Sequence, residues 1–256
     1  TFCYTYSNSM FTPCYTPFID SQWDNLYSAL TQLRKLESLY NEESTGQQEQ
    51  DEVFLLAARL QVYDFFAATV DVFGDMPFSK ACTLPLTNDV QQSYAPYDKA
   101  EDIYRTILSE LKEMAPRFRT IPVPRNFSTQ DFINWGDMDK WERYANSLRL
   151  RLAMRVASQG ELAEEGRAII KEILENPTEY PLIEEQANNV FITNQKSGQL
   201  NFTAGSGLGD WVTNRLASGP VIDRMLSHGN YNMESSDPLT GTYVEGTDDP
   251  RILLYY

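Results

Sequence analysis

Residues 139–158, DKWERYANSLRLRLAMRVAS, decide the fold of this chain. Apolar residues recur in them every three or four positions, so they share one face of an α-helix: Trp141, Tyr144, Leu148, Leu152 and Val156. A second apolar face is formed by Leu150, Met154 and Ala157. Asp139 and Glu142 have the spacing of a capping box at the start of the helix. Because most of its circumference is apolar, we expect this helix to be buried between neighbours.

Four arginines lie among those apolar residues, at positions 143, 149, 151 and 155. A buried guanidinium without a partner costs much free energy, so each arginine needs a carboxylate or carbonyl group nearby. The sequence therefore predicts a central core helix that is joined to acidic neighbours.

Four further segments show helical periodicity, at residues 20–40, 51–73, 98–114 and 160–176. We expect Gly74 to end the second in a left-handed C-cap, and Asp98 with Glu101 to cap the third. Residues 41–50 and 82–96 read as loops, and the prolines from Pro116 onward predict a linker to about residue 130. The pairs 20–40 with 51–73 and 139–158 with 160–176 predict antiparallel helix pairs of tetratricopeptide type, with the third helix between them.

The composition changes after Pro177, where Asn, Gly, Thr and Gln become frequent and only short β-like runs such as NVFITN occur. We therefore predict a mostly α-helical fold with irregular loops and minor β elements. Residues 1–256 are interpreted as one domain that is incomplete at both ends. Its helical scaffold covers residues 20–176, and the loop-rich residues 177–256 are the candidate ligand-binding part.

Charge and cysteine content restrict the function. The chain has 256 residues, a net charge of −15 and three cysteines. A protein this acidic is not suited to bind nucleic acid or to dock electrostatically on an anionic membrane. No CxxC motif is present, so a zinc or redox site has no support. Cys3 and Cys14 either pair in an exported protein or are ordinary thiols. The sequence contains no run of 18 or more apolar residues, so it predicts no transmembrane helix.

The sequence motifs that could indicate catalysis, metal binding or cofactor binding are weak. His228 is the only histidine, which disfavours a histidine-based metal site or a catalytic triad. The GSGLG run at 205–209 lacks the flanking strand and helix of a dinucleotide site. A Ca²⁺ site at Asp237, Glu245, Asp248 and Asp249 is conceivable, but the spacing matches no known loop. We therefore expect no cofactor and no enzyme activity, although a hydrolase that uses the acidic pairs is the remaining enzymatic alternative.

Sugar recognition needs aromatic rings on loops, beside polar side chains that bind hydroxyl groups. The candidate ligand-binding residues are Trp211 with its neighbours Asp210 and Asn214, a cluster of Tyr6 and Tyr15, and Trp135. For Trp211, a ring that simply packs over its loop is equally compatible with the sequence.

Several segments together are similar to one family. WDNLYSALTQL, YDFFAATVDVFGDMPFSKA, YDKAEDIYRTILSEL, DKWERYANSLRLRLAMRVA and DDPRI occur in an order and spacing that resemble the SusD/RagB family, over about residues 20–250. The resemblance implies tetratricopeptide-like helix pairs in a surface lipoprotein of Bacteroidetes-type bacteria. It also implies that the protein captures oligosaccharides and sits as a lid on a SusC-like, TonB-dependent outer-membrane transporter. Cys3 has no lipobox-like residues before it, so we expect the lipid anchor that the resemblance implies to lie outside this sequence.

Two alternatives stay open at this stage. One is a member of the same family that binds oligopeptides. The other is a helical-repeat interaction scaffold without a small ligand.

Overall fold

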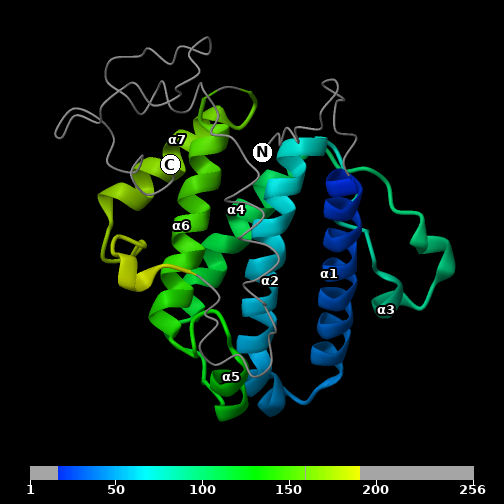
Figure 1. Ribbon diagram of the computed structural model, residues 1–256, viewed down its shortest axis with the longest axis horizontal. Coiled ribbons are helices and arrows are strands. Elements are labelled where there is room, and N and C mark those ends of the chain that lie inside the picture. The colour runs from blue at the N-terminus through cyan, green and yellow to red at the C-terminus, as the bar shows by residue number, and fades with distance from the viewer. Residues whose placement is uncertain (1–16, 159, 191–256) are drawn as a thin grey trace, which may run out of the picture. The chain divides into compact units, whose positions relative to one another are not determined.

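The computed structural model describes residues 17–158 and 160–190 (Figure 1). The chain divides into two compact units, and the described residues belong to the unit Thr16–Ser197. Its long helices are α1 (Pro17–Glu42), α2 (Thr45–Phe73), α4 (Ala100–Arg117), α6 (Met138–Val156) and α7 (Ala163–Glu175). Shorter elements are α3 (Leu84–Thr87), η1 (Val90–Ser93), α5 (Arg125–Gln130) and η2 (Gln186–Asn188). The mostly helical prediction is confirmed, and the single domain over residues 1–256 stays a prediction.

The helices pack as the sequence pairs them. Helix α1 lies along α2, and α6 packs against α7, as Figure 1 shows. Helix α4 packs mainly on α6 and less extensively on α2, which joins the two pairs. Within the described ranges the only β element is an isolated antiparallel bridge between Met76 and Asp98. Most of the NVFITN run lies outside the described residues.

The core between these helices is apolar and continuous. Its largest fully buried side chains come from every long helix and include Leu26, Leu30, Leu60, Phe66, Ile107, Leu111, Trp141 and Ile173. Trp141 stacks on Phe118 with ring centroids 5.9 Å apart. Burial of such side chains is the main favourable free energy of folding, at roughly 25 cal/mol per Å² of apolar surface.

All four arginines of α6 have the carboxylate partners that the sequence predicts. Arg149 is only 2% exposed and lies 2.7 Å from Glu172 of α7. The partners of Arg143, Arg151 and Arg155 are Asp139, Asp64 and Asp71. The second apolar face of α6 is an error, however, because Met154 is 61% exposed and Leu150 is half-buried. Ion pairs, not apolar contacts, occupy much of that side.

Several helix boundaries differ from prediction because other carboxylates cap the helices. Asp137, not Asp139, caps α6, and its side chain accepts from the N–H groups of Asp139 (3.1 Å) and Lys140 (3.3 Å). Asp139 pairs with Arg143, so it does not complete a capping box. Lys99 precedes α4 in place of Asp98, and the first free N–H of α4 binds the Asp75 carboxylate at 2.9 Å.

Turn and loop predictions also need correction. Helix α2 begins at Thr45, inside the expected loop, because its polar first turns tolerate solvent. Gly74 has φ +73° and ψ −128°, a positive φ outside the left-handed helical region. Pro116 lies inside the last turn of α4 and does not end it. The predicted loop at 82–96 holds α3 and η1, and the predicted linker holds α5.

By length and composition α2 could cross a membrane, because an 18-residue window in it has a mean hydropathy of 1.5. However, 61% of that window is buried inside the protein, as in a core helix. Its Asp64 and Asp71 also accept hydrogen bonds from Tyr144 and Tyr104, at 2.6 Å each. We therefore assign α2 to the core.

Asp131 holds the turn between α5 and α6. It is 7% exposed, and its Oδ1 accepts from the N–H groups of Ile133 (2.9 Å) and Asn134 (3.0 Å). Its Oδ2 accepts from Gly136 N–H (2.9 Å) and from the Trp141 indole (2.8 Å). One carboxylate thus positions both the turn and the central tryptophan.

We predict that Asp131→Asn lowers the free energy of unfolding by about 2–4 kcal/mol, because the amide nitrogen cannot accept from two buried donors. Urea denaturation measures the loss. Asp137→Asn is the matched control in the same turn, because asparagine caps helices as well as aspartate does. Equal losses in the two variants would contradict this role of Asp131.

A second carboxylate, Glu172 of α7, accepts hydrogen bonds from three donors: Lys112 of α4 (2.5 Å), Arg149 of α6 (2.7 Å) and the Tyr180 hydroxyl (2.8 Å). Burial alone would raise the pKa of Glu172, but these hydrogen bonds lower it to about 2. The stabilisation is therefore fully present above the ordinary glutamate pKa of about 4.3 and is lost as the pH falls toward 2.

We predict that the stability difference between the wild type and Glu172→Gln is largest above pH 5 and shrinks as the pH falls toward 2. Thermal unfolding followed by circular dichroism across that range measures it. Glu175→Gln, at the exposed end of the same helix, is the control. A difference that does not change with pH would argue against the shifted carboxyl.

Candidate functional site

The structure describes one of the predicted ligand-binding residues. Trp135 is half-buried, and its ring meets Phe132 edge-on with centroids 6.1 Å apart. It adopts a φ of +58°, which is uncommon for a residue with a side chain. Packing within its loop thus occupies part of the ring. Trp211, Asp210, Asn214, Tyr6 and Tyr15 lie outside the described residues, as do His228, Cys3, Cys14 and the acidic cluster at 237–249.

Two tyrosines that the sequence reading did not select are the most exposed aromatic residues in the described part. Tyr94 is 87% exposed and Tyr97 is 67% exposed. Both lie in residues 75–99, between α2 and α4, which we call the tyrosine loop. Pro96 lies between them in a segment predicted as a loop, and this is the sequence signal that could have indicated their exposure. Exposed apolar residues of the same loop are Leu84, Leu86 and Val90.

The two ends of the tyrosine loop are joined. Met76 and Asp98 exchange backbone hydrogen bonds of 3.2 and 3.1 Å. The Asp98 carboxylate also accepts from the N–H groups of Phe78 and Ser79, both at 2.9 Å, and from the Ser79 hydroxyl at 2.7 Å. Burial alone would raise the pKa of Asp98, but these hydrogen bonds lower it. The carboxylate therefore stays charged and keeps the ends together.

Helix α1 supports the loop along its side. The Tyr27 hydroxyl donates to the carbonyl oxygen of Pro77 at 2.7 Å. Ser38 donates in the same way to the carbonyl oxygen of Pro85 at 3.0 Å. Burial raises the pKa of Tyr27, so the phenol keeps its proton and remains a donor. The exposed rings therefore belong to a loop that is fixed at both ends and against α1.

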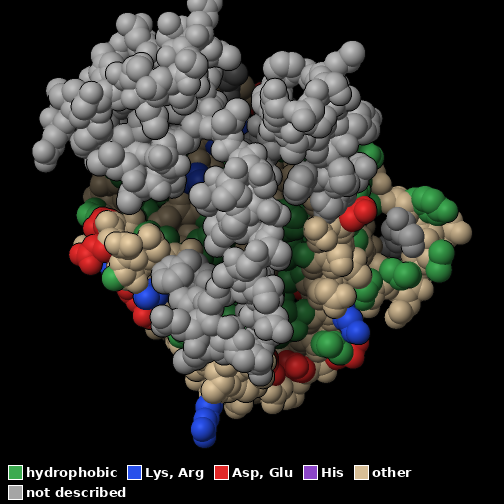
Figure 2. All heavy atoms as spheres, viewed as in Figure 1, with side chains coloured by type: hydrophobic (Ala, Val, Ile, Leu, Met, Phe, Trp, Pro, Cys, Tyr) green, Lys and Arg blue, Asp and Glu red, His purple; other side chains and the backbone are tan. Residues whose placement is uncertain are grey.

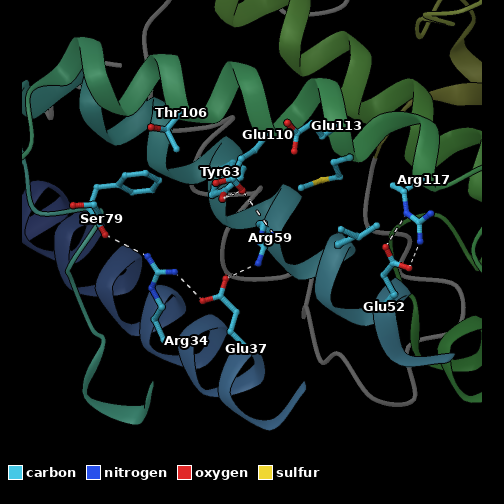
Figure 3. A pocket seen from close by; sticks show the side chains of 13 residues that line it. Arg34, Glu37, Glu52, Arg59, Tyr63, Ser79, Thr106, Glu110, Glu113 and Arg117 are labelled. Atoms are coloured by element: carbon cyan, nitrogen blue, oxygen red, sulfur yellow. Dashed lines mark hydrogen bonds and ion pairs between the residues drawn. The ribbon is translucent and has the colours of Figure 1, made fainter. Parts of the chain in front are cut away.

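A cleft of about 640 Å³ lies between α1, α2 and α4 (Figure 3). Three arginines and four glutamates line it, and we call it the charged cleft: Arg34, Arg59, Arg117, Glu37, Glu52, Glu110 and Glu113. Apolar contact surface comes from Leu56, Phe78 and Met114. The volume falls within the range of about 300–1,000 Å³ that is usual for small-molecule sites.

Ion pairs connect the walls of the charged cleft. The Glu37 carboxylate of α1 accepts hydrogen bonds from Arg34 of the same helix and from Arg59 of α2, both at 2.8 Å. The Tyr63 hydroxyl of α2 donates to Glu110 of α4. Burial and the neighbouring Glu110 carboxylate raise the pKa of Tyr63, which keeps this phenol neutral. Figure 3 shows the resulting chain of contacts from α1 across α2 to α4.

The exposed rings of the tyrosine loop are suited to stacking, and the polar side chains of the charged cleft are suited to hydrogen bonding. Among residues 17–158 and 160–190, no group of three or more His, Cys, Asp or Glu side chains is placed to hold a metal ion. The acidic residues considered above for Ca²⁺, at 237–249, lie outside that part of the chain.

Comparison with known proteins gives consistent results. A SusD-like family profile described as "Starch-binding associating with outer membrane" matches residues 5–249. The fold is similar to that of a protein called BT1043, with a TM-score of 0.56 and 22% identity, over 66% of this chain and 31% of that one. It is also similar to a SusD-like protein from Bacteroides thetaiotaomicron, with a TM-score of 0.55 and 19% identity, over 69% of this chain and 33% of that one.

A SusD/RagB family protein from Bacteroides thetaiotaomicron gives a TM-score of 0.52 and 22% identity, over 68% of this chain and 33% of its own. This chain thus spans about a third of the solved structures it resembles. None of the curated proteins compared with it matches.

We predict that Asp98→Asn speeds amide hydrogen exchange at Phe78 and Ser79 by on the order of tenfold, because a neutral amide accepts more weakly than a carboxylate and offers one acceptor oxygen in place of two. Exchange followed by NMR or mass spectrometry measures the change. Asp102→Asn, on the exposed first turn of α4, is the control. Unchanged exchange in the Asp98 variant would show that the bridge alone holds the loop.

Proposed function

The chain belongs to the SusD-like family of starch-binding proteins that associate with the outer membrane, and from this premise we propose that it captures oligosaccharides at the cell surface. We propose further that it delivers them to a SusC-like, TonB-dependent transporter and that a lipid anchor outside this chain holds it on the membrane. The proposed role is binding and transfer, without a chemical step.

The observation that carries the proposal is the exposure of Tyr94 and Tyr97 on a loop that is fixed at its base. Large aromatic side chains tend to be buried, so two neighbouring exposed rings mark an interaction surface. The apolar C–H face of a sugar ring packs well on an aromatic face, and the phenol hydroxyl binds a sugar hydroxyl.

A fixed loop also favours binding for an entropic reason. Ordering a flexible segment on binding costs free energy, which lowers the affinity of a small ligand. Tyr27 and Ser38 donate hydrogen bonds to the carbonyl oxygens of Pro77 and Pro85, and Asp98 accepts one from Phe78 N–H, so the base of the tyrosine loop is held in the free protein. Little further ordering is then needed when a sugar arrives.

The predicted residues in the later part of the chain enter the same proposal. Trp211, with Asp210 and Asn214, and the pair Tyr6 and Tyr15 are proposed as further sugar contacts. Trp135 is proposed only as an edge contact, because Phe132 packs against its ring.

We predict that Tyr94→Ala with Tyr97→Ala weakens binding of maltoheptaose by about 10–100-fold, since each ring contributes about 0.5–1.5 kcal/mol. Calorimetric titration measures the affinity. The double variant Tyr94→Phe with Tyr97→Phe is the matched control, because it keeps both rings and should lose only the hydroxyl contacts.

Unchanged affinity after removal of both rings would contradict this site. Binding of oligopeptides in place of every oligosaccharide in a panel would favour the peptide-binding alternative. A protein that binds neither, and yet retains a protein partner in Trp211→Ala, would favour the interaction scaffold.

A further inference from the structure

A second groove, of about 770 Å³, lies away from both the tyrosine loop and the charged cleft. Its lining residues come from three segments, at 118–123 after α4, 138–143 at the start of α6 and 177–184 after α7. Two of them are Pro177 and Pro181, so we call it the proline groove. It shares no lining residue with the charged cleft.

Two arginines of the proline groove already bind main-chain carbonyl groups of this protein. Arg143 donates to the carbonyl oxygen of Leu182 at 2.8 Å, and Arg119 donates to that of Glu179. Neither contact uses the side chain of the residue that is bound. The two arginines are therefore suited to recognise the backbone of a peptide segment, whatever its sequence.

Both guanidinium groups also keep N–H groups that no acceptor in the described part of the chain uses. Arg119 bonds only through Nη2, which contacts Glu179 and Glu142. Arg143 bonds through Nη1 and through Nε, which contacts Asp139. The two side chains are 41% and 25% exposed, so a ligand in the groove can reach the remaining donors.

The apolar part of the lining is suited to aliphatic groups and not to sugar rings. Its non-aromatic members include Ile121, Val123, Met138 and Leu182. Val123 is 37% exposed, so part of this apolar surface is open to a ligand. Phe118, the one aromatic residue of the lining, is only 1% exposed and offers no face for stacking. Burial of aliphatic side chains would supply the favourable free energy of binding.

The charges around the groove favour the interior of a peptide over its ends. A free carboxylate terminus would meet the side chains of Asp139, Glu142 and Glu184, and a free ammonium terminus would meet Arg119 and Arg143. Either terminus would also lose hydration on entering the groove. A segment inside a longer chain carries neither charge.

We propose that the proline groove binds an internal, uncharged and aliphatic segment of another protein, a role beyond the capture of oligosaccharides. Arg119 and Arg143 donate their unused N–H groups to its main-chain carbonyl oxygens. Val123 and Met138 pack against its aliphatic side chains. The exposed tyrosines take no part in this contact.

The test uses the full chain and the blocked peptide acetyl-Ala-Leu-Pro-Val-Ala-amide as the probe. Saturation-transfer NMR should detect binding to the wild type, and NMR titration measures the affinity. Val123→Asp should weaken binding at least about tenfold, or about 1.4 kcal/mol, because it places a carboxylate that needs hydration in the apolar lining. The same peptide with free termini should bind at least about threefold more weakly than the blocked one.

Two variants are matched controls. Val123→Leu keeps an aliphatic side chain at the same position and should bind the peptide as the wild type does. Leu174→Asp adds the same charge at a 59% exposed position of α7 outside the groove, and it should also leave binding unchanged. Circular dichroism confirms that each variant is folded.

Four results would overturn the proposal: no binding of the blocked peptide to the wild type, equal binding in the Val123→Asp and Leu174→Asp variants, tighter binding of the peptide with free termini, or displacement of the peptide by maltoheptaose. Failure of the tyrosine-loop site is distinguishable from these. The double variant Tyr94→Ala with Tyr97→Ala should bind the blocked peptide as the wild type does, whether or not that site binds sugar.

Discussion

The structure depends on carboxylate partners for the arginines of α6, three of which lie on the neighbouring helices α2 and α7. The pair between Arg149 and Glu172 is the most demanding, because a guanidinium at 2% exposure without a carboxylate would make the core unstable. Asp64 and Asp71, seven residues apart on α2, bind α6 through Arg151 and Arg155. The side chains of Arg151 and Arg155 are 62% and 61% exposed, so these two pairs add little to stability compared with the buried pair.

Helix α1 contributes to both candidate surfaces. Its inner face packs on α2, while Tyr27 and Ser38 hold the tyrosine loop through backbone carbonyl groups. Arg34 and Glu37, between those two residues in sequence, form one wall of the charged cleft. The donors on α1 contact main-chain oxygen atoms, so the side chains of the loop remain available for ligand.

In Figure 2, apolar side chains are visible on the part of the surface where α3 lies in Figure 1.

Periodicity was sufficient to predict the long helices, because burial of one face every 3.6 residues leaves a clear pattern in sequence. Helix ends were less predictable, since several aspartates compete to cap one helix. Asp137 displaces Asp139 at α6, and Asp98 joins the loop ends while Asp75 binds the start of α4. The cleft could not be predicted, because the ion pairs that join its walls, Arg59–Glu37 and Arg117–Glu52, connect residues far apart in sequence. Tyr94 and Tyr97 were missed because residue type does not distinguish an exposed ring from a buried one.

The two surfaces are joined through Phe78 and Ser79. Both residues line the charged cleft, and both donate backbone N–H groups to the Asp98 carboxylate that closes the tyrosine loop. Arg34 also donates to the carbonyl oxygen of Phe78 at 3.4 Å. Arg34 therefore links a wall of the charged cleft to the short segment that fixes the base of the loop.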